Sequence, residues 1–270
     1  MANILVFDSG VGGLSIAAVI DKYMPEHRLV FASDNAAYPY GTKSIEELVP
    51  RVVKVVEKLL YSIEIDIVVI ACNTASTVAL PELRKRLSID VVGVVPAIKP
   101  AAKISKTRNI GILATPATIK RQYTHDLVDD FAADCEVDML GSAELVEIAE
   151  QKLHCGEVSS VELERIIKPW LVDECQIDTI VLACTHFPLL KVELDSIFKK
   201  RNKHIQWVDS SEGIAKRVRF LLETNDQCTY VKPDSIEHNR AVFTTKPIVS
   251  AAFRQHLCQI NIVNLMHLNI

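Results

Sequence analysis

Residues 65–77 read IDIVVIACNTAST, and residues 177–189 read IDTIVLACTHFPL. Each stretch is a β-branched apolar run that leads into a cysteine and then into small polar residues. An apolar run without polar alternation is typical of a strand buried on both faces, as in a parallel sheet. The polar residues that follow resemble a helix start. The sequence therefore predicts the same strand–cysteine–helix unit twice, with Cys72 and Cys184 at equivalent positions.

The same alternation of strand and helix patterns extends along the chain. Further buried-strand patterns begin at residues 3, 28, 90, 109 and 205. Among the helical patterns, residues 159–171 open with the Ser/Glu signs of a helix start. Residues 44–60 place apolar side chains three and four residues apart, at Ile45, Leu48, Val52, Val55, Val56 and Leu59. This alternation predicts an α/β fold with parallel sheets, and the polar segment 223–240 is predicted to be a surface loop before a last strand and helix.

An internal repeat predicts two similar halves. The stretch NILVFDS from Asn3 resembles NIGILAT from Asn109, as the two cysteine stretches resemble each other. The offset of roughly 110 residues is too long for a solenoid and fits two open α/β domains. Ligands of such sheets bind beyond the carboxyl ends of the strands. Two facing domains would therefore bring Cys72 and Cys184 into one cleft.

Composition excludes several classes of protein. The chain has 270 residues, of which 49% are hydrophobic, which suits one large or two compact domains. The net charge of −4 gives no indication of a nucleic-acid partner. No apolar run reaches the roughly 20 residues that span a bilayer, and the first residues lack the pattern of a signal peptide. The seven cysteines form no CxxC pair, so we expect a cytosolic protein with reduced thiols.

The two matched cysteines are candidates for reactive thiols. A free cysteine is only a few per cent thiolate at neutral pH, and a helix N-terminus stabilises the thiolate. His186, two residues after Cys184, is a candidate general acid or base. The remaining cysteines are interpreted as ordinary apolar residues: Cys135, Cys155, Cys175, Cys228 and Cys258.

Two other classes of function stay open at this point. The turn FDSGVGG, with Asp34 about 20 residues further on, permits a dinucleotide-dependent oxidoreductase. In that fingerprint Gly10 and Gly12 fit, but Ser15 stands at the third glycine position, and Asp8 would face a pyrophosphate. The other class is a non-catalytic small-molecule-binding protein with a two-domain cleft. By itself, the stretch YPYG at residues 38–41 indicates only a tight turn.

Motifs in a fixed order carry a resemblance to a known family. They are FDSGVGGLS, YPYGTKS, ACNTAST, VVGVVPAIKPAA, KRQYTHDL, GSAELVEIAE, LACTHFPLL and VDSSEGIAKRV, and they span residues 4 to 225. Together they closely resemble the glutamate racemase family, whereas the two cysteine motifs alone would also suit aspartate racemase. The GSAE form, where many members have Cys-Pro, resembles the branch found in some Gram-negative bacteria. The stretch ATPAT at residues 114–118 departs from the ATRGT of many members.

The resemblance implies roles for particular residues. Cys72 and Cys184 would be the two catalytic bases, with Asp8 assisting Cys72 and with Glu150 and His186 assisting Cys184. The implied substrate-binding positions are Asp8, Ser9, Tyr40, Gly41, Asn73, Thr74, Thr115, Thr118, Thr185 and His186.

The resemblance also implies an architecture and a biological setting. The first α/β domain would comprise residues 1–96 and 208–270, the second residues 97–207, with the active site between them. Glutamate would be the substrate, with no cofactor and no metal, and the D-glutamate would supply peptidoglycan synthesis. The family is usually a cytoplasmic homodimer, and this branch implies activation by UDP-N-acetylmuramoyl-L-alanine.

The chemistry of racemisation accounts for the repeat. The α-proton of an amino acid is very weakly acidic, and without pyridoxal phosphate there is no electron sink. Hydrogen-bond donors and helix N-termini must therefore stabilise an enolate-like dianion. Inversion needs one base on each face of the α-carbon. Two matched strand–cysteine–helix units supply both requirements.

Overall fold

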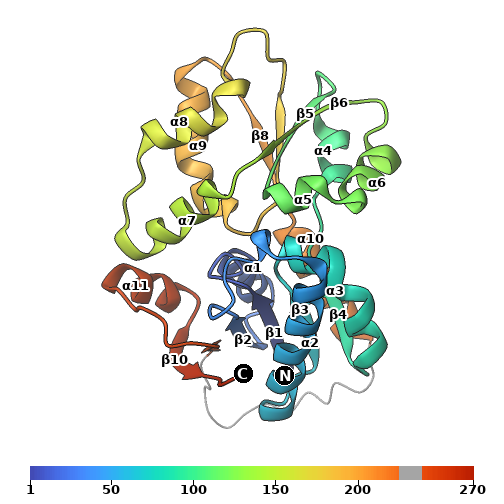
Figure 1. The fold of residues 1–270 in the computed structure, drawn as a ribbon, viewed down its shortest axis with the longest axis vertical. Helices are drawn as coiled ribbons and strands as arrows, with labels where there is room; N and C mark the ends of the chain where they lie inside the picture. The colour runs from blue at the N-terminus through green and yellow to red at the C-terminus, as the bar shows by residue number, and fades with distance from the viewer. Residues whose placement is uncertain (225–238) are drawn as a thin grey trace.

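The computed structural model describes residues 1–224 and 239–270. Most of the predicted loop at 223–240, including Cys228, lies outside the described residues. The described chain forms two parallel sheets covered by helices (Figure 1). The first sheet contains β1 (Asn3–Asp8), β2 (Arg28–Ser33), β3 (Ile67–Ile70), β4 (Asp90–Gly93), β9 (Asn239–Phe243) and β10 (Ile262–His267). The second contains β5 (Asn109–Ala114), β6 (Glu136–Gly141), β7 (Thr179–Leu182) and β8 (Gln206–Val208). The predicted class, two open parallel-sheet α/β domains, is confirmed.

Strand order reveals the internal repeat. The first sheet runs β10-β9-β2-β1-β3-β4 and the second runs β6-β5-β7-β8, with every pairing parallel. Four strands of the first sheet, β2-β1-β3-β4, therefore have the same order as the whole second sheet. β1 corresponds to β5, and β3 corresponds to β7. The two cysteines follow β3 and β7, so each stands at the end of a central strand of its sheet.

Helices cover both faces of each sheet, because the strands expose apolar side chains on both. On the first sheet, α1 (Leu14–Tyr23), α10 (Ser211–Thr224) and α11 (Ala251–Gln259) pack on one face. The other face carries α2 (Ile45–Ser62) and α3 (Asn73–Arg86). On the second sheet, α4 (Ile98–Ile104) and α6 (Gln122–Phe131) lie opposite α7 (Glu144–Cys155), α8 (Ser160–Ile167) and α9 (Lys191–Lys200). Short helical segments connect these elements: α5 (Pro116–Lys120), η1 (Tyr40–Thr42), η2 (Lys168–Trp170) and η3 (Phe187–Leu190).

Local sequence accounts for where the predicted helices begin. Ser44 and Glu47 form a capping box at the start of α2, in which each side chain accepts a hydrogen bond from the other residue's N–H. The predicted apolar stripe of α2 is buried except for its first member, Ile45, which is 49% exposed. Ser159 caps α8 in the predicted position by accepting a hydrogen bond from the N–H of Glu162.

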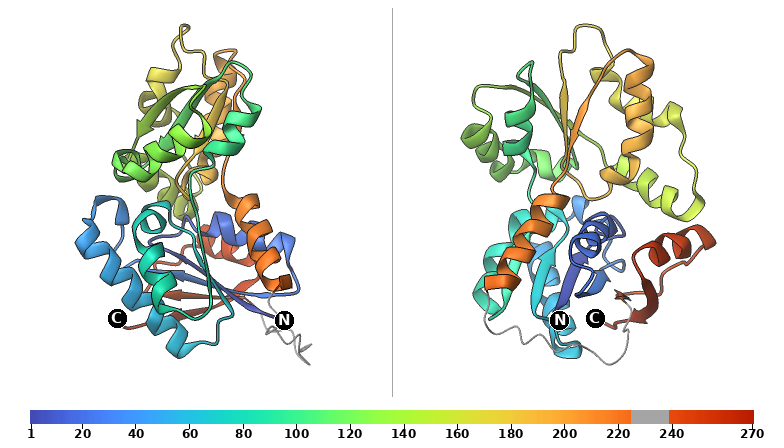
Figure 2. Two further views of the ribbon diagram at one scale, coloured as in Figure 1. Left: turned by 90° about the vertical axis from the view of Figure 1, so that its right-hand side faces the viewer. Right: turned by 180° about the vertical axis from the view of Figure 1, so that it is seen from behind.

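The chain passes between the two domains after β4 and again after β8 (Figure 2). The two crossing segments touch, because the Ser210 hydroxyl donates a hydrogen bond to the Val95 carbonyl. Within residues 1–224 and 239–270, no helix has the length and apolarity needed to cross a membrane.

Candidate active site

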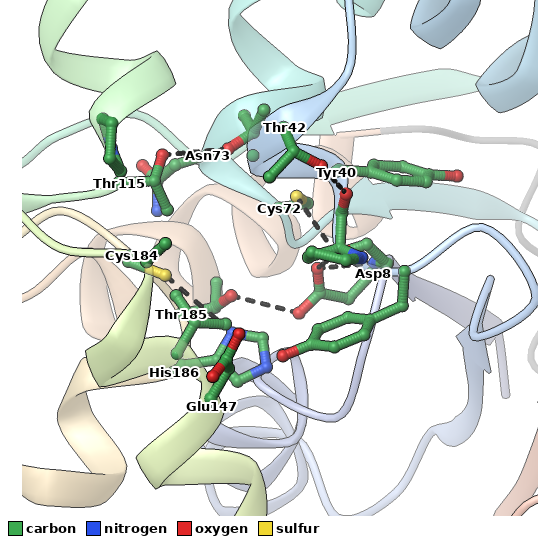
Figure 3. A pocket seen from close by; sticks show the side chains of 18 residues that line it. Asp8, Tyr40, Thr42, Cys72, Asn73, Thr115, Glu147, Cys184, Thr185 and His186 are labelled. Atoms are coloured by element: carbon green, nitrogen blue, oxygen red, sulfur yellow. Dashed lines mark hydrogen bonds between the residues drawn. The ribbon is translucent and has the colours of Figure 1, made fainter.

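A cavity lies between the two domains, where the loops after β1, β3, β5 and β7 meet (Figure 3). The volume of this cavity is about 70 Å³. Cys72 and Cys184 both line it, and each is 6% exposed. Its other lining residues are Asp8, Ser9, Tyr38, Pro39, Tyr40, Gly41, Thr42, Asn73, Thr74, Thr115, Pro116, Ala143, Val146, Glu147, Thr185 and His186. The structure therefore brings the two predicted thiols, one from each domain, to the same enclosed space.

Cys72 is paired with Asp8. Cys72 is the residue before the first turn of α3, and Asp8 is the wholly buried last residue of β1. Burial raises the pKa of the Cys72 thiol well above its usual value, and the nearby Asp8 charge raises it further. Burial also raises the pKa of Asp8, and the Ser9 hydroxyl lies within hydrogen-bond distance of both the Asp8 carboxylate and the thiol. A thiol and a carboxyl in this arrangement can exchange a proton. Ionising Cys72 and Asp8 at the same time is unfavourable, because their two negative charges would repel each other.

Contacts with both domains hold the Asp8 carboxylate. The backbone N–H of Ser9 donates to Oδ1 at 2.6 Å. From the second domain, the Thr185 hydroxyl donates to Oδ2 at 3.0 Å. The Ser9 hydroxyl lies 3.9 Å from the Cys72 sulfur, within hydrogen-bond distance for sulfur. Asp8 is therefore fixed in orientation against Cys72.

Cys184 has a different partner, a histidine held by a carboxylate. Nδ1 of His186 lies 3.8 Å from the Cys184 sulfur, and Nε2 lies 2.7 Å from Oε1 of Glu150. Burial alone would lower the pKa of His186, but hydrogen bonds and charge from Cys184 and Glu150 raise it well above its usual value. Burial works to raise the pKa of Glu150, yet His186 lowers it overall. The arrangement is a buried imidazolium between a carboxylate and a sulfur.

The glycine-rich turn after β1 makes room for this pair. A Cβ on Gly12 would lie 2.4 Å from Nδ1 of His186, and one on Gly10 would lie 2.4 Å from Oε1 of Glu150. Between them, the backbone N–H of Val11 donates to the same Glu150 oxygen at 2.9 Å. The turn therefore closes on side chains of the second domain, and this contact is the reason for its glycines.

This arrangement does not support the dinucleotide interpretation. Glu150 and His186 occupy the space against Gly10 and Gly12 that a pyrophosphate would need. Asp34, the expected ribose partner, is fully buried and accepts hydrogen bonds from three other side chains.

Most of the predicted substrate-binding residues line the cavity. Asp8, Ser9, Tyr40, Gly41, Asn73, Thr74, Thr115, Thr185 and His186 do so. Thr118 lies behind Thr115: its N–H donates to the Thr115 hydroxyl at 3.2 Å, and the two hydroxyls are 3.0 Å apart. Glu150 likewise reaches the cavity only through His186. Thr118 and Glu150 thus support residues that line the cavity.

The cavity also contains residues that the sequence did not single out. Tyr38 and Glu147 line it, and the Tyr38 hydroxyl is buried without a hydrogen-bond partner. Glu147 lies one helical turn before Glu150 on α7, so helical spacing could have indicated it. The signal for Tyr38 was only the turn motif that contains it.

The polar groups of the cavity suit a small anionic amino acid. Among the described residues that line it there is no lysine or arginine, so carboxylates would be bound by hydroxyls and backbone N–H groups. Oδ1 of Asn73 is buried and has no hydrogen-bond partner. It is therefore an acceptor that a ligand's ammonium group could satisfy. The hydroxyls of Thr74 and Thr115 lie 3.4 Å apart and connect the two domains next to Asn73.

Comparison with known proteins adds independent information. A family model described as Asp/Glu/Hydantoin racemase matches residues 14–216. The glutamate racemase of Photorhabdus laumondii is 49% identical over 242 residues, which cover 90% of this chain and 83% of that protein. The glutamate racemase of Salmonella typhimurium is 51% identical over 221 residues, which cover 82% and 77%.

Solved structures give a similar result. The structure of Escherichia coli glutamate racemase in complex with L-glutamate and the activator UDP-MurNAc-Ala has a TM-score of 0.90 and 43% identity, and the match covers 99% of this chain and 98% of that one. A glutamate racemase of Bacillus anthracis has a TM-score of 0.79 and 26% identity, with coverage of 100% and 97%.

Proposed function

We propose, from the premise that this chain belongs to the Asp/Glu/Hydantoin racemase family, that it interconverts L-glutamate and D-glutamate. The family resemblance expected from the sequence motifs is confirmed, and relatives from Photorhabdus, Shewanella and Salmonella fit the Gram-negative branch. The observation that carries the proposal is the placement of two cysteines, one from each domain, on one cavity between the domains. A racemase needs such a pair, because inversion requires one base on each face of the α-carbon.

In the direction that begins with L-glutamate, Cys184 removes the α-proton. His186, whose pKa Glu150 and Cys184 raise, places a positive charge 3.8 Å from the Cys184 sulfur. Cys72 is the proton donor on the opposite face. Its raised pKa keeps it a thiol at neutral pH, ready to deliver its proton. Cys72 therefore already carries the proton that this direction of the reaction needs.

In the direction that begins with D-glutamate, Cys72 is the base. It must first lose its proton, which its raised pKa opposes. Asp8 is the group that can accept this proton, because burial raises the pKa of its carboxyl and the Ser9 hydroxyl connects it with the thiol. Cys184 must carry a proton in this direction, and the adjacent imidazolium of His186 is the group that can give it one before Cys184 delivers it to the other face.

The deprotonated intermediate carries two negative charges and needs donors that are already in place. Thr74, in the first turn of α3, and Thr115 present hydroxyls at the cavity. The α3 N-terminus, which starts directly after Cys72, adds unpaired N–H groups and positive potential. These groups are rigid, because each lies at the junction of a buried strand and a helix.

Further properties of the family are part of the proposal. The first domain would comprise residues 1–96 and 208–270 and the second residues 97–207, as the resemblance to the family implies. The D-glutamate would supply peptidoglycan synthesis in the cytoplasm. The E. coli enzyme was solved with UDP-MurNAc-Ala as its activator, and we propose the same class of activator and a homodimer for this chain.

The direct test is circular dichroism of L-glutamate incubated with the purified protein. We expect the signal to decay to zero with no added pyridoxal phosphate, before and after dialysis against EDTA. Aspartate in parallel tests the alternative substrate of the same superfamily. A stable glutamate signal, racemisation of aspartate alone, or loss of activity on dialysis would contradict the proposal.

A further inference from the structure

A buried carboxylate behind the cavity has an unusually complete set of partners. Asp34, directly after β2, is wholly buried. The guanidinium of Arg51, on α2, makes a bidentate contact with this carboxylate: Nε donates at 2.8 Å and Nη2 donates at 2.6 Å. The hydroxyls of Tyr40 and Thr244 donate to it at 2.6 Å and 2.7 Å. Its charge is thus fully compensated, although the chemistry proposed above does not use it.

Tyr40 is the member of this network that reaches the cavity. It lines the cavity, is 1% exposed, and packs its ring 6.4 Å from that of Phe7, measured between centroids. Burial and Asp34 raise the pKa of its phenol, so the hydroxyl keeps its proton. That single proton is committed to Asp34, and the hydroxyl cannot also donate it to a ligand. Tyr40 therefore acts as a wall of the cavity with a fixed orientation.

The orientation of Tyr40 sets the position of the turn that follows. Tyr40 is the first residue of η1, and Gly41 and Thr42 of that turn also line the cavity. Gly41 lies beside the second domain, where a Cβ on it would make an ordinary van der Waals contact, 3.5 Å from the Cβ of Thr115. A shift of the Tyr40 ring would thus move a cavity wall relative to Thr115.

The side chains of the reacting groups have partners outside this network, and Asp34 meets Asp8 only through the backbone, where its N–H donates to the Asp8 carbonyl at 2.9 Å. Asp8 is fixed by Ser9 and Thr185, and His186 by Glu150. The side-chain hydrogen bonds of Asp34 and Arg51 described above join neither of these groups. Disturbing the network should therefore change how well the substrate fits and leave the proton transfers largely intact.

We infer that Asp34 and Arg51 are positioning residues for glutamate binding, which act through the Tyr40 hydroxyl to hold the cavity wall formed by η1. The inference rests on the proposed function and deepens it. It gives Asp34, which the sequence pattern associated with a dinucleotide, a different role.

The test uses Arg51→Lys, Tyr40→Phe and the double variant. Lysine keeps the positive charge, so Asp34 is not left unpaired. A lysine ammonium cannot reproduce the bidentate contact of the guanidinium. We expect Arg51→Lys to raise KM for both enantiomers about tenfold, equivalent to about 1.4 kcal/mol, with kcat within about twofold. Arg86→Lys is the matched control, because Arg86 also pairs with carboxylates, those of Glu57 in α2 and Glu82 in α3, but takes no part in the network of Asp34 and Tyr40. Its KM should stay at the wild-type value.

The double variant separates positioning from general destabilisation. If Arg51 acts through the Tyr40 hydroxyl, the double variant should have the KM of Tyr40→Phe alone. Additive increases in KM, or an Arg51→Lys protein with a lowered melting temperature but wild-type KM, would overturn the inference. A wild-type protein that does not racemise glutamate would instead refute the proposed function.

Discussion

Gly12→Ala tests whether the contact between the glycine turn and His186 matters for catalysis. The backbone of Gly12 is not in the left-handed region, so alanine introduces no backbone strain there. The new Cβ would lie 2.4 Å from Nδ1 of His186, whereas ordinary contacts begin at 3.4 Å. The imidazole must therefore move by about 1 Å, which disrupts its 2.7 Å hydrogen bond with Glu150 and its approach to Cys184. A misplacement of about 1 Å in a catalytic group typically costs about 100-fold in rate.

We expect kcat/KM of Gly12→Ala to fall about 100-fold, which corresponds to about 2.7 kcal/mol of transition-state stabilisation. Initial rates from each enantiomer, followed by circular dichroism, measure it. Gly213→Ala is the control, since a Cβ there meets nothing within 4 Å and helix α10 tolerates alanine. A folded Gly12→Ala protein with more than about a third of wild-type kcat/KM would refute the role given to this contact.

Two further predictions concern the partners of the thiols. Because the equilibrium constant between enantiomers is one, every variant must have equal kcat/KM in both directions, and asymmetry can appear only in kcat and KM separately. Asp8→Asn removes the proton acceptor of Cys72, so kcat should fall more from D-glutamate than from L-glutamate; equal losses in initial-rate measurements would show that Asp8 does not serve Cys72. Glu150→Gln removes a charge that raises the pKa of His186, so the imidazolium is lost at lower pH and the alkaline limb of kcat from L-glutamate should move to lower pH. A pH–rate profile with the wild-type limb would contradict that assignment.

The sequence predicted the central strands because they are buried on both faces. β3 and β7 are continuous apolar runs with every residue buried, and such runs are visible without a structure. The edge strands β6 and β10 were missed for the opposite reason. β6 has no fully buried residue, and β10 has one, so neither forms an apolar run. Burial on one face or none leaves a weaker signal.

The site was predictable where function depends on local sequence. Cys72 and Cys184 stand at the ends of strands in two parallel sheets, so the internal repeat together with sheet geometry predicts that facing domains bring them to one cleft. Contacts between domains were not predictable in this way. Val11 and Glu150 meet through a hydrogen bond although 139 positions separate them. The glycine turn suggested a phosphate, because its sequence does not show that a carboxylate and an imidazole of the other domain fill its space.

The central claim is that Cys72 and Cys184 are separate bases on opposite faces of the substrate, and solvent isotope incorporation tests it directly. The reaction is run from L-glutamate in D₂O and stopped early. Cys184 takes the substrate's own proton, and Cys72, already exchanged with solvent, delivers deuterium. We expect the D-glutamate formed to carry deuterium at the α-carbon while the remaining L-glutamate stays largely protonated. Early D-glutamate that retains the original hydrogen, or remaining L-glutamate that gains deuterium as fast as product forms, would contradict the account.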